Sequence, residues 1–354
     1  MKPLVSILIP AYNSEEWIVD TLRSALAQTW PNKEIIVVDD GSKDRTLDVA
    51  RRFTSQGVQV ITQKNQGAAA ARNTAFEHSK GDYIQWLDAD DLLSPDKIAT
   101  QVAKAEESGS KRTLISCGWV QFLYRYYRAK SEPTALWSDL LPAEWLMCKM
   151  GQNLHMQTAT WLVSRELTVA AGPWNTTLLS DDDGEYFCRV LLASDGVRFT
   201  PGERVYYRAS GAASLSYIGS SNRKRDAQWH SMKLHIGYLR SLEDTPRTRA
   251  ACVSYIQNWL VFFYPERLDL VEEMQNTAHE LGGEIQTPHL SWKYSWIESL
   301  FGKRLGRRAQ FVLPRFKWSV LRFGDKMLFR LGVGASSPLR AGVTEATPLG
   351  PINS

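Results

Sequence analysis

The stretch Tyr83-Ile-Gln-Trp-Leu-Asp88-Ala-Asp90-Asp91 passes from a mostly apolar run directly into three carboxylates. The run predicts a buried strand, so the acids should lie where that strand reaches the surface. Hard oxygen ligands of this kind suit Mg²⁺ or Mn²⁺, which commonly join protein carboxylates to phosphates. The alternative is a helix cap, in which Asp91 or Ser94 caps a helix that begins at Pro95. Taken alone the cluster favours the cap, and the rest of the chain favours the metal.

Strand and helix signals alternate around this stretch. The chain should therefore have an α/β fold, with a mostly parallel sheet and helices on both faces. The apolar run at the first strand is continuous, as in a strand that is buried on both sides. Ser14 is expected to open the first helix. The expected strands are 4–9, 34–38, 58–62 and 82–87, and the expected helices are 14–26, 44–53, 67–79, 95–108 and 184–192.

The length of 354 residues allows one large domain with a smaller appendage. The main domain is expected at 1–216, with a nucleotide-binding half at 1–112 and an acceptor half at 113–216. A helical extension should follow at 217–300. The last parts are a basic amphipathic segment at 301–335 and a disordered tail at 336–354.

Composition and targeting signals predict a cytoplasmic protein. Four cysteines without metal-binding spacing favour free thiols in a reducing compartment. The apolar run before Pro10 is too short for a signal peptide. No stretch reaches the roughly 18 apolar residues that a membrane span needs. Peripheral attachment at the inner face of a membrane remains compatible with these signals.

The positive charge is concentrated near the C-terminus. Between Phe301 and Val333 there are nine Lys or Arg and one acid, so this segment carries +8 and the rest of the chain −4. On a helix, one face is basic (Arg304, Arg308, Arg315, Arg322, Lys326, Arg330) and the other largely apolar (Leu313, Val320, Met327, Leu328, Leu331). A helix break is expected before Pro314. Such a helix suits an anionic membrane surface; the alternative is a helix packed on its own domain. Nucleic acid is disfavoured, because the main domain is acidic and carries no such motif.

Polar residues follow several of the expected strands, at the edge where α/β sheets bind ligands. With their neighbours, these residues form motifs whose order and spacing over about 90 residues resemble the inverting family 2 glycosyltransferases with a GT-A fold. The likeness continues more loosely to about residue 216. The resemblance implies a Rossmann-like nucleotide-diphospho-sugar transferase fold and a nucleotide-sugar donor, first of all a UDP-sugar. The matching motifs are Pro10-Ala-Tyr12-Asn13, Val38 through Asp44, Asn65-Gln-Gly67 through Asn73, Gly81-Asp82 and Leu87 through Asp91.

The resemblance also implies roles for single residues on the donor side. Asp40 would accept a hydrogen bond from the base, with Asp39 beside it. Tyr12, in the same segment as Pro10, would pack against base or ribose, and Arg72 would lie near the base or diphosphate. Each has a plainer reading as a turn, packing or solvated residue.

Asp88 and Asp90 correspond to the DxD pair of these enzymes. One of them would contact ribose or sugar, and Asp90 would ligate a divalent Mn²⁺ or Mg²⁺ on the diphosphate. Such a metal offsets the charge that builds on the departing nucleoside diphosphate.

Asp181 through Arg189 resembles the family's ED-x-D-L-x-x-R element. Alignment on Arg189 makes Asp183 the candidate general base, with Asp182 as the alternative. Acids at a helix start are also favoured by the helix dipole alone. Glu185 and Trp174 are expected on the acceptor side, although Trp174 equally suits the core.

Processive synthases of the family carry a Gln-x-x-Arg-Trp motif and membrane helices, and neither is found here. Transfer of one sugar to a glycan, a lipid-linked glycan or another hydroxyl acceptor is therefore expected. A binding protein of the same fold would not need the acids at 181–185. A nucleotidyltransferase would need a Gly-rich, Lys/Arg-bearing phosphate loop that the first strand lacks.

Overall fold

A computed structural model describes residues 2–209, 221–288, 297, 299–300 and 303–331, with the backbone alone at 303–312 and 314–316. The expected disordered tail at 336–354 and the expected domain boundary near residue 216 lie outside the described residues.

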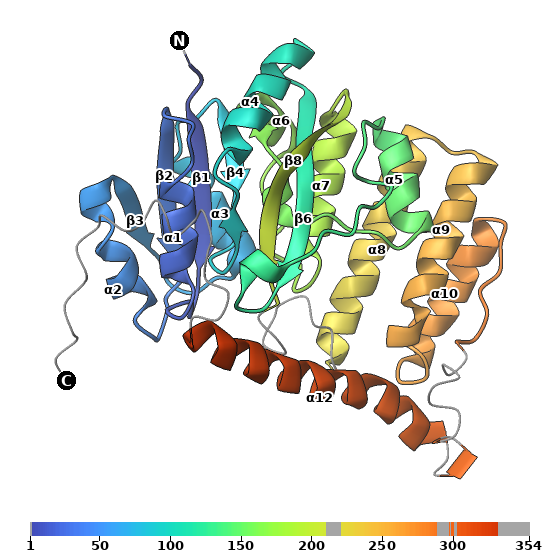
Figure 1. Cartoon of the computed structure of the whole chain (residues 1–354). Helices are drawn as coiled ribbons and strands as arrows, with labels where there is room; N and C mark the ends of the chain where they lie inside the picture. Colours follow the sequence, from blue (N-terminus) through green and yellow to red (C-terminus); the bar gives the residue numbers. More distant parts are fainter. Residues whose placement is uncertain (1, 210–220, 289–296, 298, 301–302, 332–354) are drawn as a thin grey trace.

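The main sheet has five strands, and four of them are parallel. Only the short edge strand β7 runs antiparallel to its neighbour β4. The predicted α/β fold with a mostly parallel sheet is thus confirmed (Figure 1). In spatial order the strands are β3 (Val58–Thr62), β2 (Lys33–Asp39), β1 (Val5–Ala11), β4 (Tyr83–Trp86) and β7 (Val163–Ser164).

Side chains along β1 alternate between two hydrophobic cores, as the period of a strand requires. Leu8 packs in one core with Ala71 and Ala75 of α3 (Ala68–Glu77). Ile7 and Ile9 pack in the other core, which the helices α1 (Ile18–Leu26), α2 (Thr46–Arg51) and α4 (Lys97–Ser108) cover. Helices therefore cover both faces of the sheet.

The first helix begins later than the sequence predicts. It starts at Ile18, not directly after Ser14, because the preceding groups bind elsewhere. The backbone N–H of Ser14 donates to Thr46 Oγ1 at 2.7 Å, and Glu15 accepts from the backbone N–H of Arg45 at 2.7 Å. These contacts hold Ser14 and Glu15 against the segment that follows β2, so the ends of β1 and β2 are joined at one edge of the sheet.

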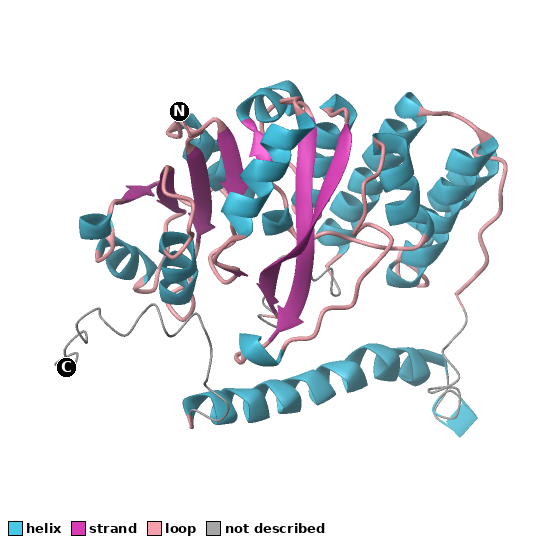
Figure 2. Ribbon diagram, turned by 45° about the horizontal axis from the view of Figure 1, so that its top comes forward, coloured by secondary structure: helices cyan, strands magenta, loops and turns pink. Residues whose placement is uncertain are grey.

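A second sheet of three strands stands beside the first (Figure 2). Its long strands β6 (Thr113–Phe122) and β8 (Gly196–Arg208) are parallel, and the short β5 (Leu92–Leu93) pairs antiparallel to β8. The connection from β6 to β8 includes α5 (Pro142–Gly151), α6 (Arg165–Ala171) and α7 (Asp182–Ala193).

The expected helical extension is formed by α8 (Asn222–Leu242), α9 (Pro246–Trp259) and α10 (Leu268–Glu280). Its buried Trp229, Tyr255 and Met274 belong to the same hydrophobic core as Trp161 of the main domain. The extension is thus packed as a continuation of that domain.

Helix α12 (Lys303–Arg330) lies along the side of the molecule where the parallel strands end (Figures 1 and 2). Helix α12 is continuous through Pro314, so the predicted break before this residue is wrong. A proline inside a helix removes one backbone hydrogen bond, and here the helix continues on both sides of it. Among the described residues, no helix has the length and apolar character that crossing a membrane requires.

Candidate functional site

Two acidic groups meet at one arginine beyond the carboxyl ends of the sheet. Arg72 Nη2 lies 2.8 Å from Asp88 Oδ1, and Arg72 Nη1 lies 2.9 Å from Asp182 Oδ2. Asp88 follows β4, whereas Asp182 begins α7, 94 residues further along the chain. The structure therefore brings the acids after the fourth strand next to those at the start of α7.

Arg72 is held rigidly in this bridge. It comes from α3 and is buried, and its guanidinium lies 4.3 Å from the ring centroid of Trp174. Burial alone would lower the pKa of Arg72, but the charges of Asp88 and Asp182 outweigh it and raise the pKa. The arginine is thus a permanent cation, and its Nε is buried without a partner.

The three acids in the turn after β4 differ in burial, since Asp91 is buried and Asp88 and Asp90 are partly exposed. Asp91 is fully buried, and it accepts hydrogen bonds from the backbone N–H of Arg208 and from Gln157 Nε2. Burial raises the pKa of Asp91 well above its ordinary value, and the charges of Asp90 and Asp88 add to this. Asp91 therefore ties the turn to β8. The helix-cap alternative is wrong, because Asp91 is engaged there and Ser94 Oγ donates to Glu203.

Asp88 and Asp90 are partly exposed beside each other. Among the described residues no group of three or more His, Cys, Asp or Glu is arranged to hold a metal by itself. One or two carboxylates nevertheless fit a Mg²⁺ or Mn²⁺ ion that takes its other ligands from phosphate and water. Asp90 stays the predicted principal ligand, and Asp88 is paired with Arg72.

The end of β2 carries two buried aspartates with different partners. Asp40 accepts from the backbone N–H groups of Gln66 and Gly67, both within 2.9 Å, and from Gln63 Nε2. Asp40 thus fixes the loop that leads into α3. Asp39 Oδ2 accepts from the N–H of Ser42, whereas Asp39 Oδ1 is buried without a partner. The carboxylate of Asp40 is therefore occupied by its own loop, whereas one oxygen of Asp39 has no partner among the described residues.

The other residues expected at the nucleotide differ in exposure. Tyr12 directly follows β1 and is 45% exposed, so its ring is available to a ligand. Pro10 is buried within β1 and shapes the strand end without offering surface.

The start of α7 is fixed from beneath by α8. Asp181 adopts a left-handed backbone conformation with φ of 58°, which Asp tolerates better than most residues. Its carboxylate accepts from Ser231 Oγ at 2.8 Å and from Gln228 Nε2 at 3.2 Å. Asp181 therefore serves as the anchor that places the two following acids.

Asp182 and Asp183 lie in different surroundings. Burial raises the pKa of Asp182 to about 6; Arg72 opposes this shift, and the charges of Asp183 and Asp88 add to it. Asp183 is partly exposed, and it accepts from Thr158 Oγ1 at 3.3 Å and from the N–H of Gly184. The first carboxylate is held by an arginine, and the second is oriented by neutral donors.

Two residues expected on the acceptor side are structural. Trp174 is only 2% exposed; its ring stacks on Tyr186 at 4.0 Å between centroids, and Arg72 lies over it. No face of the indole is left for a sugar. Glu185 is also buried and binds Arg189 at 2.7 Å and Tyr238 Oη at 2.8 Å. Both expectations are therefore corrected: Trp174 supports Arg72, and Glu185 locks α7 to α8.

Arg208 is a site residue that sequence reasoning missed. Its Nε donates to the backbone carbonyl of Asp90 at 2.8 Å, and its guanidinium lies 4.3 Å from the ring centroid of Trp17. Arg208 thus supports the acidic turn from 118 residues away in the chain. No local pattern around it signals this role.

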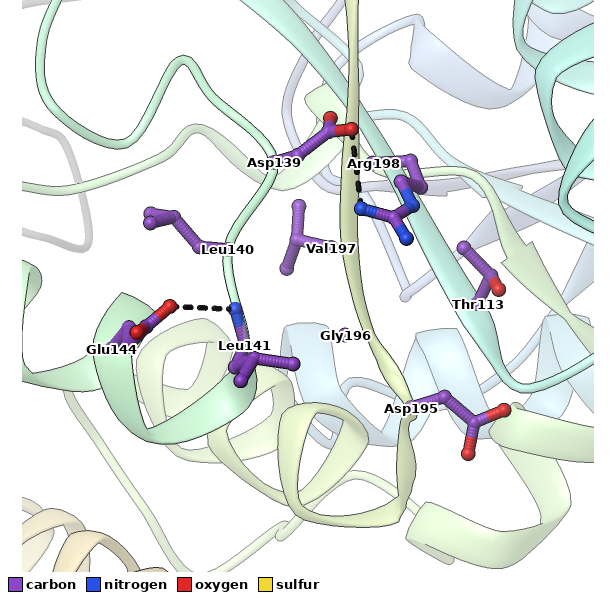
Figure 3. Close-up of a pocket in the computed structure, with 9 residues that line it drawn as sticks. All are labelled: Thr113, Asp139, Leu140, Leu141, Glu144, Asp195, Gly196, Val197 and Arg198. Carbon is purple, nitrogen blue, oxygen red and sulfur yellow. Dashed lines mark hydrogen bonds and ion pairs between the residues drawn. The ribbon is translucent and has the colours of Figure 1, made fainter.

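The cavity drawn in Figure 3 is remote from these residues. It has a volume of about 170 Å³ and is lined by Thr113 and Gly196, which begin β6 and β8, with Asp139 and Arg198 paired at 3.2 Å. It therefore lies at the amino ends of parallel strands, opposite the edge where α/β sheets bind ligands.

Known proteins share this sequence pattern and this fold. Residues 6–166 match the model of the family described as glycosyl transferase family 2. A glycosyltransferase of Rickettsia felis is 40% identical over 316 residues, which cover 84% of this chain and 50% of that protein. The chain spans about half or less of the length of the first curated relatives that it matches.

Two solved structures show the same fold at low sequence identity. S. aureus TarS in complex with UDP has a TM-score of 0.55 at 16% identity, covering 86% of this chain and 92% of that one. The mannosyltransferase PcManGT from Pyrobaculum calidifontis, in complex with GDP-Man and Mn²⁺, has a TM-score of 0.52 at 17% identity, covering 95% and 89%. Residues 6–166 thus carry the sequence pattern of glycosyl transferase family 2, and the chain has the GT-A-like fold of these solved structures.

Proposed function

We propose that the protein transfers one sugar from a nucleotide-sugar to a hydroxyl group of a glycan or lipid-linked glycan, in polysaccharide or glycan biosynthesis. The observation that carries this proposal is the bridge from Asp88 through Arg72 to Asp182. Because Arg72 joins the predicted donor-side Asp88 to Asp182 of the predicted pair of general-base candidates, the bridge supports a reaction in which the donor diphosphate and the acceptor hydroxyl both lie next to Arg72.

The donor base is assigned to Asp39. Its buried, unpartnered oxygen suits the imino N–H of uracil or of guanine. Tyr12 would cover the base or ribose. UDP-sugars are the first donors to test, because TarS was solved with UDP, and GDP-sugars follow, because PcManGT was solved with GDP-Man.

Asp90, with Asp88, would hold a divalent Mn²⁺ or Mg²⁺ against the donor diphosphate. When bound, such an ion supplies Lewis-acid stabilisation of the leaving group. Arg72 adds a fixed positive charge at the same place, which stabilises a developing negative charge without reorganising.

Asp183 is assigned as the general base of an inverting displacement. It is partly exposed, and two neutral donors orient it. It would take the proton of the acceptor hydroxyl while that oxygen attacks the sugar. Asp182 is the alternative base, since its pKa of about 6 lies near the usual working range of general bases.

A thermal-shift panel of nucleotide-sugars with and without Mn²⁺ tests donor binding, because a ligand stabilises the state that it binds. The matching donor should raise Tm, and more so with metal. Asp90→Ala should lose the metal-dependent part. Asp139→Asn, an acid at the opposite end of the molecule, is the control and should behave as wild type.

The transfer step is tested with Asp183→Asn. This variant should retain the donor shift and lose transfer by about a hundredfold or more. If Asp183→Asn transfers sugar at the normal rate, Asp182 and not Asp183 would be assigned as the general base. Donor binding by the wild type without any transfer, over a broad acceptor panel, would favour a binding protein of the same fold; no shift with any donor would contradict the proposal.

A further inference from the structure

The side chains described in helix α12 and at its end, Leu313 and residues 317–331, lie on two opposite faces, and one of these faces touches the protein. The described residues Arg322, Asp325, Lys326 and Phe329 recur at helical spacing and are less exposed than their neighbours. They pack against the segment that follows β6 and the segment that follows β1. This inner face carries three of the five charged side chains in the described part of the helix.

The inner face is well fixed. Asp325 Oδ2 accepts from the backbone N–H groups of Tyr124 and Arg125 at 2.9 and 3.1 Å, and its Oδ1 pairs with Arg125 Nε. Lys326 Nζ lies 2.7 Å from Glu16 Oε1. Phe329 contacts the ring of Tyr124, with 6.2 Å between the centroids. The opposite face of the helix must therefore point away from the domain.

That outer face is apolar. Val320 is 56% exposed, Met327 42% and Leu331 71%. Successive residues turn by 100° on a helix, so these three lie within one narrow sector and lie opposite Arg322 and Asp325. The exposed Leu313 lies in the same sector, and three further exposed apolar side chains widen it on both sides: Leu321, Phe323 and Leu328.

The charges of α12 complement an anionic surface. Residues 303–330 contain nine Lys or Arg and one acid, Asp325, and that acid is used on the inner face. Arg330 is exposed at one margin of the apolar sector, and Lys317 is exposed within the sector. An apolar face with cations at its margins is the pattern of helices that lie in the plane of anionic lipid headgroups.

A second copy of the chain fits this face less well. Leu313, Val320 and Met327 recur every seven residues, as in a coiled coil. The companion positions four residues further on are Lys317, Gly324 and Leu331. A charge and a glycine at two of the three seam positions would pack poorly against a partner helix.

Helix α12 is also joined to the candidate site. Tyr124, which contacts α12, packs on Trp17 with 5.3 Å between centroids. Trp17 in turn lies under Arg208, which donates to the carbonyl of Asp90. Helix α12 thus lies at the same edge of the sheet as the acidic turn after β4 (Figure 1).

We propose that α12 is an interfacial helix that binds an anionic lipid surface and holds the catalytic edge beside it. Resting on the proposed function, this favours an acceptor that the lipid surface itself presents, namely a lipid-linked glycan. The lipid binding does not depend on the transfer reaction and is tested separately from it.

Flotation of the full chain with vesicles tests the proposal. The protein should float with vesicles of phosphatidylglycerol and phosphatidylcholine, and much less with phosphatidylcholine alone or at high salt. The variant Val320→Gln/Met327→Gln/Leu331→Gln should bind anionic vesicles about tenfold or more weakly, because three apolar side chains no longer enter the interface.

The control replaces three exposed apolar residues elsewhere, as Val169→Gln/Leu242→Gln/Leu268→Gln, and should float as wild type. Both variants should keep the donor-induced Tm shift, which separates loss of lipid binding from loss of the proposed activity. Failure of the wild type to float, equal flotation on both lipids, or equal flotation of both variants would overturn the proposal. A wild-type dimer that the α12 variant converts to monomer would overturn it in favour of a second copy.

Discussion

At the scale of single residues, the pairing of Arg72 with two aspartates is the feature on which the candidate site depends. A buried arginine that joins Asp88 to Asp182 neutralises part of an acidic edge before any ligand arrives. It also lowers the pKa of Asp182, which burial raises to about 6. Arg72 thus sets the pH range over which Asp182 is ionised.

Replacing Arg72 with Met should move the acid limb of the pH profile of kcat/KM. Without the positive charge, the pKa of Asp182 should rise further, by about one unit or more. Asp182 would then become protonated already at higher pH. With Asp182 as the base, the alternative assignment, activity should therefore fall earlier as the pH is lowered. The measurement is kcat/KM from pH 5 to 9 for wild type, Arg72→Met and Arg72→Lys.

Arg72→Lys keeps the charge and should shift the limb less than Arg72→Met. Arg72→Met should also lower the free energy of unfolding by about 3 kcal/mol, because two carboxylates lose their counter-charge. An unmoved acid limb with reduced kcat would mean that Arg72 acts on the donor alone.

At this scale the sequence predicted which residues gather at the candidate site better than it predicted which groups each of them binds. The acids after the second and fourth strands and at 181–183 all lie at one edge, as the parallel sheet predicts. The different partners of Asp39 and Asp40 were not predictable, because they depend on which carboxylate the loop at residues 63–67 binds. Trp174 was open between core and sugar contact, and only its stacking on Tyr186 decides for the core.

At the scale of elements, the start of α7 positions the side chains of Asp182 and Asp183. Gly184 lies so close to Asp181 that a Cβ at position 184 would clash with Asp181 Oδ1. That carboxylate is itself held by Ser231 and Gln228. A glycine is thus required for the buried anchor to remain in place.

Gly184→Ala should push Asp181 from its donors and displace the acids that follow it. We expect a loss of about 1–3 kcal/mol of stability, the cost of disturbing a buried hydrogen-bonded group, and a larger loss of transfer than of donor binding. Gly237→Ala in α8 is the control, because a Cβ there meets open space. It should stabilise the protein by up to about 1 kcal/mol. Equal Tm values for the two variants would contradict this role of Gly184.

The expected elements were found with small shifts at their ends. The third strand is found at Val58–Thr62 as predicted, because its apolar run is short and bounded by Gly57. The first helix was predicted too early, because Ser14 and Glu15 are typical of a helix start but bind the segment that follows β2. Contacts from another part of the chain decide that end, and local sequence does not contain them.

At the scale of the whole molecule, the motifs predicted the fold and the α12 helix but not how the C-terminal parts attach. The helical extension contributes to the main core through residues such as Trp229, which a helical pattern alone does not reveal. The basic face of α12 looked available to a membrane, yet Arg322 and Lys326 point to the protein and the apolar face points outward. Attachment depends on groups 200 to 310 residues apart.

The attachment of α12 should depend on Asp325 more than on any exposed pair. Asp325 and Arg125 side chains are each 16% exposed, and Asp325 also accepts from two backbone N–H groups. Asp325→Ala leaves these donors and Arg125 unpaired, at a cost of about 3 kcal/mol. Amide hydrogen exchange in residues 317–331 should accelerate by about a hundredfold, since 1.36 kcal/mol corresponds to a factor of ten, with no change in β1.

Lys326→Gln is the matched control on the same face of α12. Its pair with Glu16 is 33% and 47% exposed, so it should contribute no more than about 1 kcal/mol. If Asp325→Ala and Lys326→Gln exchange alike, the buried carboxylate is not the attachment point. Because Asp325 lies opposite the apolar sector, Asp325→Ala should still float with anionic vesicles. The lipid-bound helix would then be loosened from the catalytic edge, which separates lipid binding from the positioning of that edge.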